Sequence, residues 1–223
     1  INEDGFVNIL DVVILVNWII NGGPVCEGIE DTDGNCYETI QIGEQVWMAE
    51  NLKVTHYNDG SEITYPSNED FGSYDEGQYG VYDNDPSNAD IYGNLYNWAV
   101  VGDDRGVCPE GWHVPTDEEY PVLTDYLGGE SVAGGKMKEE GLDHWNSPNE
   151  GATNESGFTG LPAGYRYYDH GYYINMGNYG YFWSSSEGNP SSAWTRVLNY
   201  NSSNVVSGNY IKRGGFSIRC LKD

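Results

Sequence analysis

Four cysteines, Cys26, Cys36, Cys108 and Cys220, limit the folds open to this chain more than any other feature of its sequence. None has the spacing of two to four residues that is typical of zinc ligands, so disulfides formed in an oxidising compartment are the better interpretation. Cys26 and Cys36 are close enough in sequence for a local bridge, which would leave Cys108 and Cys220 for a long-range one. The other connectivities stay open, and free buried thiols are the alternative to any bridge.

The composition predicts a folded, loop-rich chain. Its 223 residues are enough for one large domain or two small ones. Nineteen Tyr and seven Trp favour a packed core with hydrogen-bonded edges, and thirty Gly indicate many turns. No signal peptide is present, so Ile1 indicates a processed or trimmed start.

The charge balance excludes two classes of partner. Ten basic residues stand against thirty-five acidic ones, for a net charge of −25. Such a surface repels phosphate backbones and anionic lipid, so binding to nucleic acid or to a membrane surface is not expected. No apolar run reaches the roughly 18 residues that a membrane span needs. Acidic loops instead suit divalent cations and solubility outside the cell.

Residues 1–23 form the first predicted domain, an acidic loop followed by a helix. Calcium loops of the EF-hand type place oxygen ligands at fixed positions around a glycine at position 6. With Gly5 there, every testable position carries a suitable ligand, and position 1 alone falls before the chain begins. The predicted calcium ligands are Asn2, Asp4, the Phe6 carbonyl, Asn8 and Asp11. A simple turn and helix cap is the alternative.

The stretch NEDGFVNILDVVILVNWII closely resembles one half of a type I dockerin repeat. This resemblance implies a calcium-binding loop followed by a short helix. Dockerins carry two such loops and bind a cohesin partner, and a second copy is not found in the sequence, so intact dockerin function is not expected.

The helix after this loop is apolar on nearly every side, with Asn17 the single polar residue between Val12 and Ile20. A helix of this kind must be covered on all sides. We expect a second copy of the chain, or another domain, to cover part of it; complete burial in its own domain is the alternative. The predicted assembly residues are Val12, Val13, Leu15, Val16, Trp18, Ile19 and Ile20.

Residues 24–223 form the second predicted domain, of class α+β. The alternation in YETIQIGEQVWMAENL predicts a hairpin, IYGNLYNWAVV a strand or short helix, and the region from Tyr57 to Asp90 long ordered loops. A capping box of Thr116 and Glu119 predicts a helix that places Leu123, Tyr126 and Leu127 on one face. The short alternating runs GYFWSSSE, SAWTRVLNY, SNVVSG and GGFSIRCLKD predict a small antiparallel sheet.

Six sequence words connect this second domain to a known family: DTDGNCYETIQIGEQVWMAENLKVTHYNDG, YGNLYNWAVV, CPEGWHVPTDEEY, GATNESGFTGLPAGYR, YFWSSSE and GGFSIRCLKD. Through them the chain from about residue 31 to 223 resembles the Fibrobacter succinogenes major paralogous domain of bacterial secreted and surface proteins. That family is similar to the C-type lectins and the formylglycine-generating enzymes. The resemblance therefore implies a C-type-lectin-like body, and it supports a Cys108–Cys220 disulfide between CPEGW and IRC.

Two further sites are predicted with alternatives. SPNEG superficially resembles a calcium-dependent sugar-binding motif, with Asn149 and Glu150 as candidate ligands, although a second ligand set is missing. Trp183 and Trp194 could stack on sugars but fall in strand-like runs typical of a core. Asp31 and Asp33 in DTDGN are candidate ligands for a second calcium ion, with an Asp-Gly turn as the alternative.

Two N-glycosylation motifs begin at Asn154 and Asn201. Asn201 lies among polar residues in a predicted hairpin turn, so it is the better acceptor. Asn154 lies inside one of the family words, where a buried structural amide is the alternative. Ser- and Thr-linked glycans on neighbouring loops are equally compatible with the sequence.

Catalysis is not expected. The four histidines, His56, His113, His144 and His170, show no metal-binding spacing, and the cysteines are assigned to disulfides rather than to oxidase chemistry. Because carboxylates are abundant, any proposed catalytic pair of them is expected by chance.

The sequence thus predicts a non-catalytic, calcium-stabilised module located outside the cell or on a bacterial surface. Its expected role is as a subunit of a glycosylated filament or array that self-associates through the N-terminal helix. The alternative is a carbohydrate-binding or adhesive module of a secreted glycan-degrading system.

Overall fold

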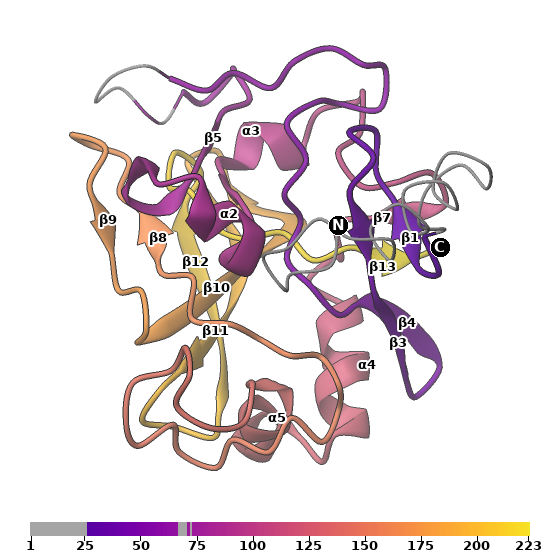
Figure 1. Cartoon of the computed structure of the whole chain (residues 1–223), viewed down its shortest axis with the longest axis vertical. Coiled ribbons are helices and arrows are strands. Elements are labelled where there is room, and N and C mark those ends of the chain that lie inside the picture. Colours follow the sequence, from indigo (N-terminus) through magenta and orange to yellow (C-terminus); the bar gives the residue numbers. More distant parts are fainter. Residues whose placement is uncertain (1–25, 67–70, 72) are drawn as a thin grey trace, which may run out of the picture.

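The computed structural model describes residues 26–66, 71 and 73–223. The predicted calcium loop and apolar helix of residues 1–23 lie outside these residues. The described chain is α+β, as predicted, with short helices and several small antiparallel sheets (Figure 1).

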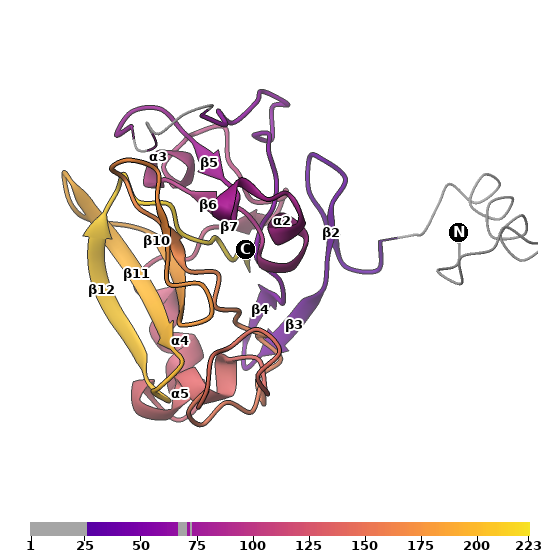
Figure 2. The ribbon, with the colours of Figure 1, turned by 60° about the vertical axis from the view of Figure 1, so that its left-hand side comes forward.

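One sheet is formed by the three longest described strands, in the order β10-β11-β12. These strands are β10 (Tyr179–Asn189), β11 (Ser192–Asn199) and β12 (Val205–Ile211). They pair antiparallel, as their alternating sequence predicts, although the register of β10 shifts between Trp183 and Glu187. Figure 2 shows β12 at the outer margin of the sheet.

A second sheet of four strands has the order β3-β4-β13-β7. The predicted hairpin forms its first two strands, joined by a turn at Gly43 with a positive φ of 63°. The C-terminal run GGFSIRCLKD is predicted to belong to the same antiparallel sheet as residues 180–208. Its Ser217 does bridge Phe182 of β10, but in parallel, and its last residues pair with the first hairpin and with β7, beside the Cys108–Cys220 disulfide. The strands are β3 (Thr39–Ile42), β4 (Gln45–Met48), β13 (Leu221–Lys222) and β7 (Trp112–His113).

Three two-stranded sheets and short helices occupy the connections between these sheets. The segment IYGNLYNWAVV, predicted as a strand or a helix, contains both β6 and α3. The paired short strands are β1 (Ile29–Glu30) with β2 (Cys36–Tyr37), β5 (Tyr79–Gly80) with β6 (Leu95–Tyr96), and β8 (Tyr165–Arg166) with β9 (Tyr173–Ile174). The short helices are the 3-10 helix η1 (Tyr82–Asn84), α2 (Ser87–Tyr92) and α3 (Trp98–Val101).

The capping box correctly predicts helix α4 (Glu119–Tyr126), which α5 (Glu130–Met137) follows. The Glu119 carboxylate accepts hydrogen bonds from the Thr116 amide at 2.8 Å and from its hydroxyl at 2.9 Å. Leu123 is buried, as expected, but Tyr126 is 66% exposed and does not share its face. An α-helix has 3.6 residues per turn, so residues three and four positions apart lie on nearly the same side of it. In a short helix the sequence therefore defines the buried face poorly.

The hydrophobic core lies on both faces of the β10–β12 sheet. Since successive side chains of a strand point to opposite faces, Trp183 and Val197 enter one cluster while Phe182 and Leu198 enter the other. Trp183 is fully buried, in agreement with its predicted core role, whereas Trp194 is half-buried.

Candidate functional site

A cleft of about 570 Å³ opens beside β5. It is lined by aromatic side chains and by a histidine that is hydrogen-bonded to a carboxylate. Its volume is within the range of about 300–1,000 Å³ that small-molecule sites usually occupy. Its lining residues are Thr55, His56, Glu62, Ile63, Thr64, Tyr65 and Tyr79.

A tight reversal of the chain places His56 beside Glu62. The Tyr57 amide donates to the Ser61 carbonyl and the Ile63 amide to the Thr55 carbonyl, both at 2.8 Å. His56 and Glu62 are bridge partners between these two hydrogen bonds, so their side chains project to the same side at close range.

Asp33 orients the imidazole of His56 through a hydrogen bond. Its carboxylate lies 2.5 Å from His56 Nδ1, and it also accepts hydrogen bonds from the Thr55 amide at 2.5 Å and the Thr55 hydroxyl at 2.8 Å. Burial raises the pKa of Asp33, but these hydrogen bonds and the nearby imidazole lower it by more than burial raises it. The pKa of Asp33 therefore lies below the ordinary value. With His56 Nδ1 bound to the Asp33 carboxylate, Nε2 is the ring nitrogen left for another partner.

Two tyrosines form the other wall of the cleft. The rings of Tyr65 and Tyr79 lie 5.1 Å apart at an angle of 53°. The Tyr65 hydroxyl donates to Asn84 Oδ1 at 3.0 Å, and the Tyr79 ring rests against Tyr96, 6.3 Å behind it. Tyr65 is 41% exposed, so its ring is open to a ligand, and the Tyr79 ring packs against it as a support.

Sequence reasoning missed this cleft because its parts are distant in the chain. Asp33 and Thr55 are 22 residues apart, and no local motif connects the DTDGN turn with VTHYNDG. The one available signal was that both lie in a single stretch of the family resemblance, DTDGNCYETIQIGEQVWMAENLKVTHYNDG.

Asp31 and Asp33, the candidate ligands of a second calcium ion, lie in a turn where neighbouring protein groups donate hydrogen bonds to them. Asp31 is buried and accepts hydrogen bonds from the Asp33 and Asn35 amides at 2.9 and 3.0 Å and from the Tyr37 hydroxyl at 2.5 Å. Asp33 binds Thr55 and His56 as described above. The Asp-Gly turn that was the alternative to calcium is therefore present, and calcium at this turn stays a prediction.

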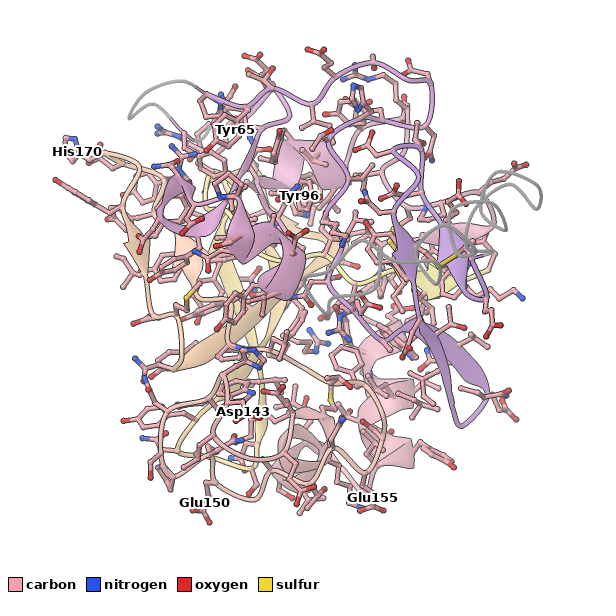
Figure 3. The ribbon with its side chains drawn as sticks, viewed as in Figure 1. Tyr65, Tyr96, Asp143, Glu150, Glu155 and His170 are labelled. Atoms are coloured by element: carbon pink, nitrogen blue, oxygen red, sulfur yellow. A yellow bond between two sulfur atoms is a disulfide. The ribbon has the colours of Figure 1, made fainter. Side chains whose placement is uncertain are left out.

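Asn149 and Glu150, the predicted sugar ligands, differ in exposure. Asn149 is buried, and its amide donates to the carbonyls of Glu139 and Gly141 at 2.9 and 2.8 Å. Glu150 is exposed. Figure 3 shows Glu150 and Glu155 at the opposite end of the molecule from Tyr65, so the predicted pair and the cleft are separate places.

The two predicted glycan acceptors also differ. The Asn154 side chain exchanges hydrogen bonds with Thr159, and Ser156 of the same motif is buried and donates to the Lys136 carbonyl. These hydrogen bonds give the Asn154 amide a structural role, although the residue is half-buried rather than buried, and its modification stays a prediction. Asn201 is exposed in the turn between β11 and β12, as the sequence predicts, and its modification stays a prediction.

The remaining histidines are not among the residues that line the cleft. His113, predicted to be packed in the core, is half-buried between Asp223 and Glu119, at 2.6 and 3.0 Å. His144 binds Glu139, and His170 is exposed at the turn before β9. Across the described part of the chain, no group of three or more His, Cys, Asp or Glu side chains is arranged to hold a metal ion.

Both predicted disulfides are present: Cys26–Cys36 and Cys108–Cys220, with Cα atoms 5.6 and 5.9 Å apart. The described residues contain no helix that is both long enough and apolar enough to cross a membrane.

These features define a disulfide-linked α+β domain with small antiparallel sheets. The chain belongs to the family described as the Fibrobacter succinogenes major domain, whose pattern matches residues 40–222. This confirms the family resemblance inferred from the sequence words; the dockerin resemblance lies outside the matched range. No curated protein matches the chain.

Proposed function

We propose that the chain is a non-catalytic, calcium-stabilised structural module that works outside the cell and assembles with copies of itself into a surface filament or array. The β12 edge supplies one contact between copies, and the N-terminal helix predicted from residues 12–20 supplies another. Two different contacts on one subunit are what an extended assembly requires.

The disulfides support an oxidising location. Structural disulfides persist in secreted and surface proteins and are rare in reducing compartments. All four cysteines of the chain are paired in this way, including the long-range pair that joins residues 112 positions apart.

The distribution of acidic residues is the observation that carries the assembly proposal. All thirty-five acidic residues lie outside residues 188–222, a segment that contains five of the ten basic residues. This segment contains the whole β11–β12 hairpin and the chain after it up to residue 222. Strand β12 itself, VVSGNYI, contains no charged residue. It is therefore a part of a strongly acidic surface where two copies can approach without carboxylate repulsion.

Strand β12 is also an open edge. Among the described strands its neighbour is β11, and the Lys212 amide donates to the Ser191 carbonyl at the end of this pair. The alternation of an antiparallel ladder then directs the backbone groups of Ser207 and Asn209 away from β11. Natural edge strands usually carry charge, proline or a bulge that prevents pairing; β12 has neither charge nor proline, and its Val206 is 49% exposed.

The test is the size of the assembly in solution with and without a charge on this edge. We expect the wild-type chain to self-associate in millimolar calcium and Val206→Lys to weaken this association at least tenfold, measured by light scattering after size-exclusion chromatography. Val122→Lys is the matched control, because Val122 is also 49% exposed but lies on helix α4. Deleting residues 1–23 should remove the second contact and limit the assembly to pairs.

Two outcomes would refute the proposal. Uniform monomers by electron microscopy at high protein concentration and millimolar calcium would exclude assembly. Equal association of the two lysine variants would exclude the β12 edge.

Carbohydrate binding is the second candidate function. The cleft beside β5 favours it, because an exposed tyrosine ring and hydrogen-bonding side chains share one opening. A module can both assemble and bind glycans, so the two functions are tested separately.

A further inference from the structure

We propose that the cleft formed by His56, Glu62, Thr64, Tyr65 and Tyr79 binds a neutral oligosaccharide. This inference rests on the carbohydrate-binding function proposed above and names its ligand class and residues, and it does not depend on the assembly role. A sugar ring presents an apolar C–H face and a rim of hydroxyl groups. A site for it needs an exposed aromatic surface beside planar hydrogen-bonding groups, and the cleft contains both.

The apolar contact is provided by Tyr65. Its ring is held by the hydrogen bond to Asn84 and by the Tyr79 ring 5.1 Å away, so little rotamer freedom remains to be lost on binding. Ile63 lines the same opening and is itself buried. A saccharide on Tyr65 would thus meet a rigid surface.

The hydroxyl groups would be bound on the His56 side. Glu62 is exposed beside His56 and offers two carboxylate oxygens that can accept hydrogen bonds from neighbouring hydroxyls. His56 Nδ1 is hydrogen-bonded to the Asp33 carboxylate, which orients the imidazole and leaves Nε2 for a sugar hydroxyl, as an acceptor in the neutral ring and as a donor in the protonated one. Charge-assisted hydrogen bonds of this kind are the stronger ones.

The charge of the cleft selects among sugars. Asp33 and Glu62 contribute negative charge from one side, and Glu76 accepts a hydrogen bond from Thr64 at 2.9 Å on the other. An anionic saccharide would meet carboxylates on both sides, so the ligand class is neutral. The described residues of the cleft include no group arranged for a metal ion, and binding is expected to be independent of calcium.

The experiment is titration calorimetry of the full chain with four probes: cellohexaose, xylohexaose, mannohexaose and hexagalacturonate. We expect at least one neutral hexasaccharide to bind with a Kd between about 10 μM and about 1 mM, unchanged by EDTA, and hexagalacturonate not to bind. Tyr65→Ala and Glu62→Gln should each weaken this binding about tenfold. Tyr65→Phe should retain it within about threefold, because the ring remains.

Tyr126→Ala is the control, since Tyr126 is more exposed than Tyr65 but lies on helix α4. It should bind the probe like the wild type, and the melting temperature of each variant shows that it is folded. Failure of all three neutral probes to bind more tightly than about 10 mM would overturn the proposal. So would equal affinity of the folded Tyr65→Ala and Tyr126→Ala variants, or loss of binding in EDTA. None of these results bears on assembly through β12.

Discussion

Single residues with long-range partners hold the loops of this domain in place. Lys138 is fully buried, and its ammonium group donates to the carbonyls of Glu150, Asn199 and Ser202 at 2.9, 2.9 and 3.0 Å. One side chain thereby ties the loop at residue 150 to the turn between β11 and β12. In a chain with few helices, such cations supply contacts that regular secondary structure provides elsewhere.

Arg219 plays the same part near the C-terminus. Its guanidinium group is buried over the Phe158 ring, 4.4 Å from the ring centroid, and donates to the Thr159 carbonyl and to Asn51 Oδ1 at 2.9 and 2.8 Å. The planar fork of arginine suits several acceptors at once. This joins segments that are more than 160 residues apart in sequence.

At the residue scale we predict a pH-dependent contribution of His113 to stability. Burial lowers the pKa of His113, but hydrogen bonds to Asp223 and Glu119 and their negative charges raise it more, so its pKa lies above the ordinary value. Protonation then favours the folded state. The contribution is complete below the unfolded pKa of about 6.5 and is lost as the pH rises through the higher folded value.

Urea unfolding of the wild type and His113→Gln at about pH 5.5 and about pH 8.5 measures this contribution. We expect the difference in unfolding free energy between the two proteins to be larger at the lower pH. His170→Gln changes an exposed histidine and is the control. A difference that grew with pH would show that His113 is held neutral in the folded chain.

These residue-scale contacts could not be predicted from sequence. Thr116 and Glu119 were recognised because a capping box is local, and its hydrogen bonds are present. The partners of Lys138 lie up to 64 residues away and are backbone carbonyls, which leave no mark on sequence. The same reason hid the Asp33–His56 pair of the cleft.

At the scale of elements, the two disulfides close loops of very different length and are expected to contribute differently to stability. Cys108 and Cys220 are buried next to β7 and β13 and close a loop of 112 residues, whereas Cys26–Cys36 closes one of 10 residues beside β1 and β2. In the chain-entropy account, the stabilisation by a disulfide grows with the logarithm of the loop that it closes. The long-range bridge should therefore contribute more.

We predict that Cys108→Ala with Cys220→Ala lowers the unfolding free energy by about 4–5 kcal/mol, and Cys26→Ala with Cys36→Ala by about 2.5–3 kcal/mol. Urea unfolding of both double variants at one pH gives the comparison. Equal losses would mean that loop closure is not the source of the stabilisation.

Elements with a strong local signal were predicted well. The β3–β4 hairpin, helix α4 and the strands around Trp183 follow from alternation, capping and turns. The run that contains β13 reaches the β10–β12 sheet only through the parallel bridge of Ser217 with Phe182. Strand β13 itself pairs in the other sheet, because two residues carry no pairing information and the disulfide decides their position. The α+β class followed from the order of the predicted helices and strands, whereas the C-type-lectin-like body was implied only by the family resemblance.

At the scale of the whole molecule, the net charge of −25 opposes contacts between copies, so the proposed assembly would have to use surfaces that minimise repulsion. Strand β12, which contains no charged residue, meets this condition. The cleft, with its carboxylates, does not, which is why we propose a neutral small molecule for the cleft and a second copy for β12.

This argument predicts how assembly responds to salt. The Debye length falls from about 10 Å at 0.1 M salt to about 3 Å at 1 M, so added salt screens the repulsion between acidic copies but leaves the hydrogen bonds of a paired edge strand. Raising KCl from about 20 mM to about 500 mM should therefore lower the dissociation constant of the wild-type assembly about tenfold, measured by analytical ultracentrifugation. Val206→Lys, which blocks pairing rather than repulsion, should remain weakly associated at both concentrations. If salt dissociated the wild-type copies, attraction between opposite charges would be holding them together, and the uncharged β12 edge would not be the contact.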